Sequence, residues 1–145
     1  MQIVTTHKNC DFDGLASMFA VTLLYPEAVA VLPKAVNPNV RAFLSVHKDI
    51  FTFRRPTEVD LGAVSRLFVV DTAQWRRLDG LAALQTKEDL AIRIWDHHPG
   101  QQDMDAEICV QEPVGACISL LVRELEARRL ALTPIQATLF LTGLY

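Results

Sequence analysis

The sequence predicts an α/β domain with a doubly wound, mainly parallel five-stranded sheet and helices on both faces. Apolar strand-like runs alternate with helical patterns along the chain, which is the arrangement that builds a parallel sheet. Several runs are continuously apolar, as at 67–70, and this is typical of strands buried on both faces. The 145 residues, half of them hydrophobic, are enough for about one globular core, so we treat 1–145 as one domain.

The expected elements follow one another with few long connections. Strands are expected at residues 2–6, 28–32, 66–71, 90–96 and 106–110, with a further short strand possible at 51–53. Helices are expected at 14–25, 38–47, 77–84 and 115–130, and from Pro134 to the last residue. Pro26 ends the first helix because the residue before proline avoids helical dihedrals, whereas Pro134 suits the first turn of a helix.

Composition and charge exclude several classes of protein. A net charge of −3 argues against a strongly basic nucleic-acid-binding face. Three cysteines without a Cys-x-x-Cys pair indicate reduced thiols in a cytoplasmic protein. No signal peptide opens the chain, and no apolar run approaches the about 20 residues of a membrane helix. The glycine-rich motifs of P-loop, dinucleotide-binding and serine-hydrolase sites are missing.

Polar clusters follow three of the expected strands. His7–Asp13 comes after the first strand, Asp71 after the strand at 66–71, and His97 and His98 come after Asp96 at the end of the next. Ligands of parallel sheets bind beyond the carboxyl ends of the strands, close to where the strand order reverses. We therefore expect the three clusters to meet at one edge of the sheet.

The residue types in these clusters indicate metal chemistry. The candidate ligands are His7, Asp11, Asp13, Asp71, Asp96, His97 and His98. So many donors suggest two ions about 3.5–4 Å apart, the arrangement used for in-line displacement at phosphorus. Mixed imidazole and carboxylate ligands suit Mn²⁺, with Co²⁺, Zn²⁺, Fe²⁺ or Mg²⁺ as alternatives. Asp11 or Asp13 could instead cap the first helix, and Asp71 could be an ordinary acid at a strand end.

The clusters also resemble a known family. His7-x-Asn9-x-Asp11-x-Asp13, then Val70-Asp71-Thr72, then Asp96-His97-His98 are similar to motifs I, II and III of the DHH phosphoesterase superfamily. That superfamily includes exonucleases, oligoribonucleases, cyclic-dinucleotide phosphodiesterases and manganese-dependent pyrophosphatases. The amino-acid sequence at 6–17 and 112–116 most resembles the amino-terminal DHH domain of tRNA nucleotidyltransferases and poly(A) polymerases that contain CBS domains.

The resemblance implies a role for each residue. One ion would be held by His7, Asp11 and Asp71, and the other by Asp13, Asp71 and His97, with Asp71 bridging both. His98 would contact the substrate phosphate, and Asp96 would orient the histidines. The reaction implied is hydrolysis of a phosphodiester or phosphoanhydride in a phosphate-containing small molecule or a short nucleic acid.

Some features have two interpretations. Gly115 and Ala116 begin a helix whose free amides could bind phosphate, although helix packing explains them equally well. Arg41, Arg54 and Arg55 could bind phosphates or form a solvated face.

The resemblance also implies missing parts. The family's motif IV aspartate follows a segment like 142–145, where this chain stops. We therefore expect the first part of a larger protein, without its substrate-binding, CBS and nucleotidyltransferase domains, and with weak or no activity by itself. The alternative is a non-catalytic metal- or RNA-binding module of such a nucleotidyltransferase.

Overall fold

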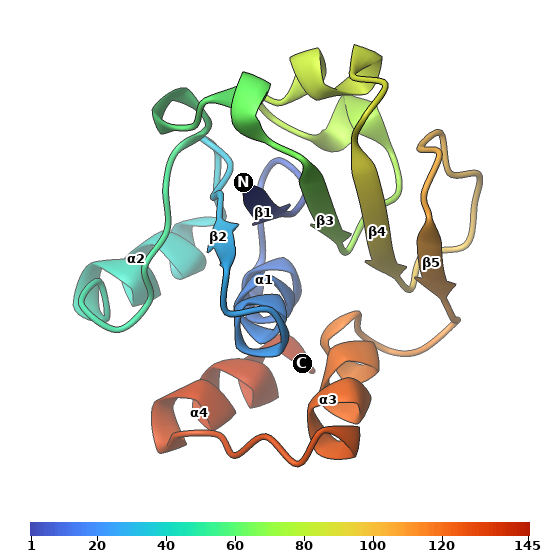
Figure 1. Cartoon of the computed structure of the whole chain (residues 1–145). Coiled ribbons are helices and arrows are strands. Elements are labelled where there is room, and N and C mark those ends of the chain that lie inside the picture. The colour runs from blue at the N-terminus through green and yellow to red at the C-terminus, as the bar shows by residue number, and fades with distance from the viewer.

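The computed structural model describes residues 1–145, and its centre is a five-stranded sheet in which every pair of neighbours is parallel (Figure 1). The spatial order is β2-β1-β3-β4-β5, so β3 lies beside β1 and β4 follows, as the convergence of the three clusters requires. The strands are β1 (Gln2–Thr5), β2 (Ala28–Ala30), β3 (Arg66–Val70), β4 (Ala91–Asp96) and β5 (Ile108–Gln111).

Helices of two kinds cover the two faces, which confirms the predicted fold class. On one face α1 (Phe12–Leu24) packs against α3 (Ile118–Ala127) and α4 (Pro134–Gly143), and α2 (Pro38–Val46) lies at the β2 edge (Figure 1). The other face is covered by 3₁₀ helices and their connections: η1 (Pro56–Glu58), η2 (Leu61–Ala63), η3 (Trp75–Arg77) and η4 (Ala82–Thr86). No helix has the length and apolar character needed to cross a membrane.

The continuous apolar runs are explained by burial on both sides of the sheet. In β3, Phe68 and Val70 belong to the core beneath α1, whereas Leu67 and Val69 belong to the second core under the 3₁₀ helices. Successive residues of a strand point to opposite faces, so a strand with two buried faces needs apolar residues at every position.

The structure corrects two expected elements. The prediction of one helix at 77–84 is wrong. The structure has two separate 3₁₀ helices, η3 and η4, on either side of a turn at Gly80, whose φ is +72°. Residues 51–53 form no strand, although Arg54 makes an isolated parallel bridge to Val31. Among the boundaries, α1 begins at Phe12 because the Asp11 side chain caps it.

The topology determines where a site can form. From β1 the chain moves outward to β2, and it then returns to build β3 on the other side of β1. The connections that leave β1 and β3 therefore run in opposite directions and open a crevice beyond the carboxyl ends of these strands. His7 follows β1 and Asp71 follows β3, so both lie at this switch point.

Candidate metal centre

Asp71 is the central residue of the site. It follows β3 directly, is 2% exposed, and donates its backbone N–H to the carbonyl of Trp95 at 2.9 Å. Its φ is +60°, a left-handed conformation that few residues other than glycine adopt but that aspartate and asparagine tolerate. Its Oδ1 atom is buried and accepts no hydrogen bond, which is unfavourable unless a cation or another donor binds there.

Two histidines lie on either side of the Asp71 carboxylate. His7 Nε2 is 3.1 Å from Oδ2, and His97 Nε2 is 3.1 Å from Oδ1. His7 Nδ1 donates to the carbonyl of Lys8 at 2.8 Å, and His97 Nδ1 donates to the carbonyl of Val114 at 3.0 Å. Since a carbonyl can only accept, Nδ1 of each ring carries a proton, and Nε2 is the atom that would bind a cation shared with Asp71. This is the arrangement that prepares histidine as a metal ligand.

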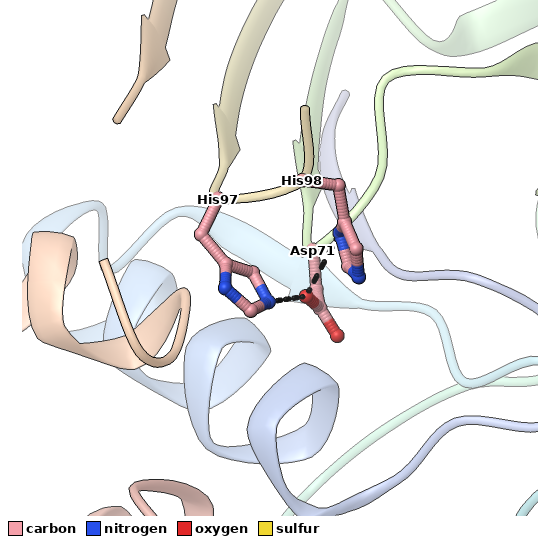
Figure 2. Close-up of side chains that lie close together, drawn as sticks. All are labelled: Asp71, His97 and His98. Carbon is pink, nitrogen blue, oxygen red and sulfur yellow. Dashed lines mark ion pairs between the residues drawn. The ribbon is translucent and has the colours of Figure 1, made fainter. Parts of the chain in front are cut away.

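His98 approaches the same carboxylate from the turn after β4. Figure 2 shows His97 and His98 extending from neighbouring positions toward Asp71, and His98 Nδ1 lies 3.7 Å from Asp71 Oδ1. Asp96 is buried and accepts hydrogen bonds from His98 Nδ1 at 2.8 Å and from the His98 backbone N–H at 3.2 Å. Asp96 therefore orients His98, whereas the Val114 carbonyl orients His97.

Asp11 and Asp13 each combine a capping contact with a place beside the histidines. Asp11 Oδ1 accepts from the Gly14 N–H at 3.0 Å and lies 3.8 Å from His7 Nε2. Asp13 Oδ2 lies 3.5 Å from His97 Nε2, but the Asp13 carboxylate also accepts from the backbone N–H groups of Cys117 and Ile118. The first amides of α3 are thus occupied by a protein carboxylate.

These side chains line a cavity of about 440 Å³, together with Gly115, Ala116 and the end of the chain at 142–145. Arg77 lines it as well and is its only Lys or Arg. Its backbone carbonyl accepts from Lys8 N–H at 2.8 Å, and its guanidinium forms no ion pair. No sequence signal distinguishes Arg77, because only the fold shows that η3 meets the loop after β1.

Accumulated carboxylates control the protonation of the site. Burial disfavours the charged form of His7, but Asp11 and Asp71 outweigh it and raise the pKa of His7 to about 10. The hydrogen bond with His7 lowers the pKa of Asp11 to about 2. Burial, together with the charge of Asp71, raises the pKa of Asp13 to about 6. Without a cation, the carboxylates therefore hold a proton on His7 and favour one on Asp13, whereas Asp11 stays ionised.

The donor set fits divalent cations. His7, Asp11 and Asp71 form one group with ligand atoms within 4.8 Å of one another, and Asp71, His97 and His98 form another. Asp71 belongs to both groups through its two different oxygens, as a bridging carboxylate would. The buried Oδ1 without a hydrogen bond and the two oriented imidazoles are what a cation would satisfy.

The fold and the site define a class of protein. The model of the DHH family, N-terminal domain, matches residues 2–144, and the chain belongs to this family. Over 147 residues the chain is 31% identical to the A-adding tRNA nucleotidyltransferase of Geobacter sulfurreducens, and over 146 residues it is 30% identical to that of Aquifex aeolicus. These alignments cover 100% and 99% of this chain but only 17% and 16% of the two relatives.

Solved structures share the fold at lower sequence identity. A putative family II inorganic pyrophosphatase of Methanococcus jannaschii has a TM-score of 0.74 and 19% identity, covering 99% of this chain and 47% of that one. An exopolyphosphatase-related protein of Bacteroides fragilis has a TM-score of 0.75 and 15% identity, covering 97% and 44%. At these identities the likeness establishes the fold alone.

Proposed function

We propose that this chain is the phosphohydrolase domain of a larger protein and uses two divalent cations, with Mn²⁺ preferred, to hydrolyse a phosphodiester or phosphoanhydride. The observation that carries the proposal is the Asp71 carboxylate, whose two oxygens each lie 3.1 Å from a different histidine Nε2. His7, Asp11 and Asp71 would hold one cation. Asp13, Asp71 and His97 would hold the other, with His98 at its side.

The chemistry that such cations supply is Lewis-acid activation of water and neutralisation of charge on the phosphoryl oxygens. The remaining work belongs to the protein's own groups. Asp96 holds His98 Nδ1–H, which leaves Nε2 free, and His98 lines the cavity with its side chain 45% exposed. A protonated His98 would donate Nε2–H to charge that develops on the phosphate.

Arg77 would hold the substrate in place. Arg77, whose guanidinium forms no ion pair, lines the same cavity as the carboxylates, and a guanidinium matches the geometry of phosphate oxygens. Gly115 and Ala116 line the cavity beside it and would lie against the substrate. A phosphate between Arg77 and His98 would thus be oriented before it reacts.

The two curated relatives are described as A-adding tRNA nucleotidyltransferases, and this chain spans about one sixth of their length. We propose that it has the same place in a protein of that kind, and that full turnover requires the rest of that protein to close over the phosphate. The substrate would be a nucleotide, an oligonucleotide or pyrophosphate.

Calorimetric titration with Mn²⁺ tests the proposal, with Asp71→Asn as the variant and the exposed Asp89→Asn as the matched control. Asp71→Asn should greatly weaken binding, and Asp89→Asn should not. Hydrolysis of bis-p-nitrophenyl phosphate, pyrophosphate and oligoribonucleotides is then compared between this chain and a longer version that covers the length of the relatives. Unchanged Mn²⁺ binding in Asp71→Asn refutes the bridging role. Tight binding without turnover in the longer version instead favours the non-catalytic module.

A further inference from the structure

A hollow beside the metal centre is lined by three cations and no acidic residue. Lys34, Arg41 and Arg55 line a space of about 360 Å³ next to the loop after β2, with Ser45 as the other polar residue. All three cationic side chains are exposed, and none takes part in a salt bridge or a side-chain hydrogen bond. The carboxylates of Asp79 and Glu58 accept the backbone N–H groups of Lys34 and Arg55 at 3.0 and 2.6 Å, but neither acid lines the hollow.

The hollow lies on the same edge of the sheet as the metal centre. The segment after β2 runs beside the loop after β1: Val36, which lines the hollow, forms a parallel bridge with Cys10, the neighbour of Asp11. Hydrogen bonds of 2.9 Å join Asn9 N–H to the Ala35 carbonyl and Asn37 N–H to the Cys10 carbonyl. Figure 1 shows β2 and α2 together at the end of the sheet opposite β5. The segment that lines the hollow therefore lies side by side with the loop that carries Asp11.

The other half of the lining is apolar. It contains the half-buried Phe53, over which the Arg55 guanidinium lies 5.9 Å from the ring centroid, together with Leu32, Val36 and Leu44. Inorganic polyphosphate has no group that uses an apolar surface. A nucleic acid strand has both parts, because its phosphates match the cations and its bases stack on or pack against aromatic and apolar side chains.

Two adjacent arginines, Arg54 and Arg55, line different cavities. Arg54 and Arg55 are adjacent in an extended segment, and the Arg54 backbone is tied to β2 by hydrogen bonds with Ala30 and Leu32. Arg55 lines the cationic hollow, whereas Arg54 lines a different cavity against Phe19 and Phe51. Arg54 is therefore a control of the same charge in the same loop.

From these observations we infer that the hollow formed by Lys34, Arg41, Arg55 and Phe53 binds the backbone of a single-stranded nucleic acid whose end enters the metal centre. The position of the cleaved phosphate rests on the proposed function, but binding in the hollow does not. The inference selects an oligonucleotide, not pyrophosphate, as the ligand class.

The test is fluorescence anisotropy with a labelled oligoribonucleotide of about twelve nucleotides, within the span of known single-strand sites. It is carried out in EDTA, so that binding is separated from hydrolysis. The Lys34→Ala/Arg41→Ala/Arg55→Ala variant is compared with Arg54→Ala/Arg66→Ala/Arg129→Asn, which removes the same charge elsewhere. Asparagine is used at 129 because this residue has a φ of +55°.

The Lys34→Ala/Arg41→Ala/Arg55→Ala variant should lose at least about tenfold in affinity. The slope of its log affinity against log salt concentration should become smaller in magnitude by about 2, since three phosphate contacts contribute about 0.7 each on single strands. The control variant should stay within about twofold of the unchanged protein. Phe53→Ala should weaken oligonucleotide binding without changing the salt slope. Equal losses in the two triple variants, or competition by inorganic polyphosphate as strong as that by the oligonucleotide, would overturn the inference. Loss of Mn²⁺ binding or turnover in other assays would bear on the proposed function alone.

Discussion

Asp13 in α1 caps α3 from the other end of the chain: its carboxylate accepts the N–H of Cys117 at 2.7 Å and of Ile118 at 2.8 Å. A charge-assisted cap of this kind contributes about 1–2 kcal/mol. Asp13→Ala should therefore lower the free energy of unfolding by about that amount in urea titrations with EDTA. Asp13→Asn should lose less, because one amide oxygen still accepts and the repulsion by Asp71 disappears, although its NH2 group cannot accept the second N–H. Equal stability of Asp13→Ala and the unchanged protein would show that the cap contributes nothing.

The pKa of His7 predicts how stability depends on pH without metal. This pKa is about 10 in the folded protein and 6.5 as the ordinary value, so the folded state binds more protons between these limits. The stabilisation is complete below pH 6.5 and is lost as the pH rises through 10. His7→Gln should flatten this part of the stability curve, whereas His47→Gln, outside the site, should keep it. A curve for the unchanged protein that stays level over this interval contradicts the charge pairing of His7.

Asp96 and His98 should behave as one unit in catalysis. With the longer version of the protein, Asp96→Asn should lower kcat by about 10–100-fold, as is usual when a buried partner of a site histidine is changed. His98→Ala should lose at least as much, and the double variant no more than His98→Ala, because Asp96 acts through His98. Ring ¹⁵N shifts of His98 give a readout without turnover and should change in Asp96→Asn. Additive losses would mean that Asp96 acts independently.

Gly143 allows α4 to approach α1. A Cβ atom at this position would lie 2.9 Å from the Ala16 Cβ and 3.0 Å from the Phe12 carbonyl oxygen. Gly143→Ala should destabilise the fold by about 1–3 kcal/mol, despite the better helix propensity of alanine. Gly115→Ala is the control, because nothing lies within 4 Å of a Cβ atom there. Thermal unfolding compares the two variants, and equal melting temperatures would show that α4 can shift without cost.

The sequence predicted the parts of the fold that depend on local signals. Runs buried on both faces identified β3 and β4, and the proline at 134 marked the start of α4, which Thr133 caps in the structure. The polar clusters at strand ends could be grouped because parallel strands bring their carboxyl ends to one edge.

Other features left no local signal. Leu78, Leu81 and Leu84 are spaced as on a helix and belong to one buried cluster, yet Leu78 follows η3, Leu81 precedes η4, and only Leu84 lies within a 3₁₀ helix. Periodicity cannot separate these cases. The edge strand β5 is mostly exposed, so its pattern did not determine its bounds, which begin two residues later than expected. The contact between Asp13 and Cys117 joins residues 104 positions apart, and only the folded structure reveals it.

The left-handed backbone at Asp71 restricts which residues this position can hold. With a φ of +60°, only glycine, asparagine and aspartate fit at little cost, and of these three only aspartate carries a negative charge. Residue 71 is therefore specified twice, once by the dihedral angle that turns the chain out of β3 and once by the charge between the two imidazoles. A glutamate in its place would keep the charge and strain the turn, while a glycine would relax the turn and remove the charge. No single substitution preserves both properties.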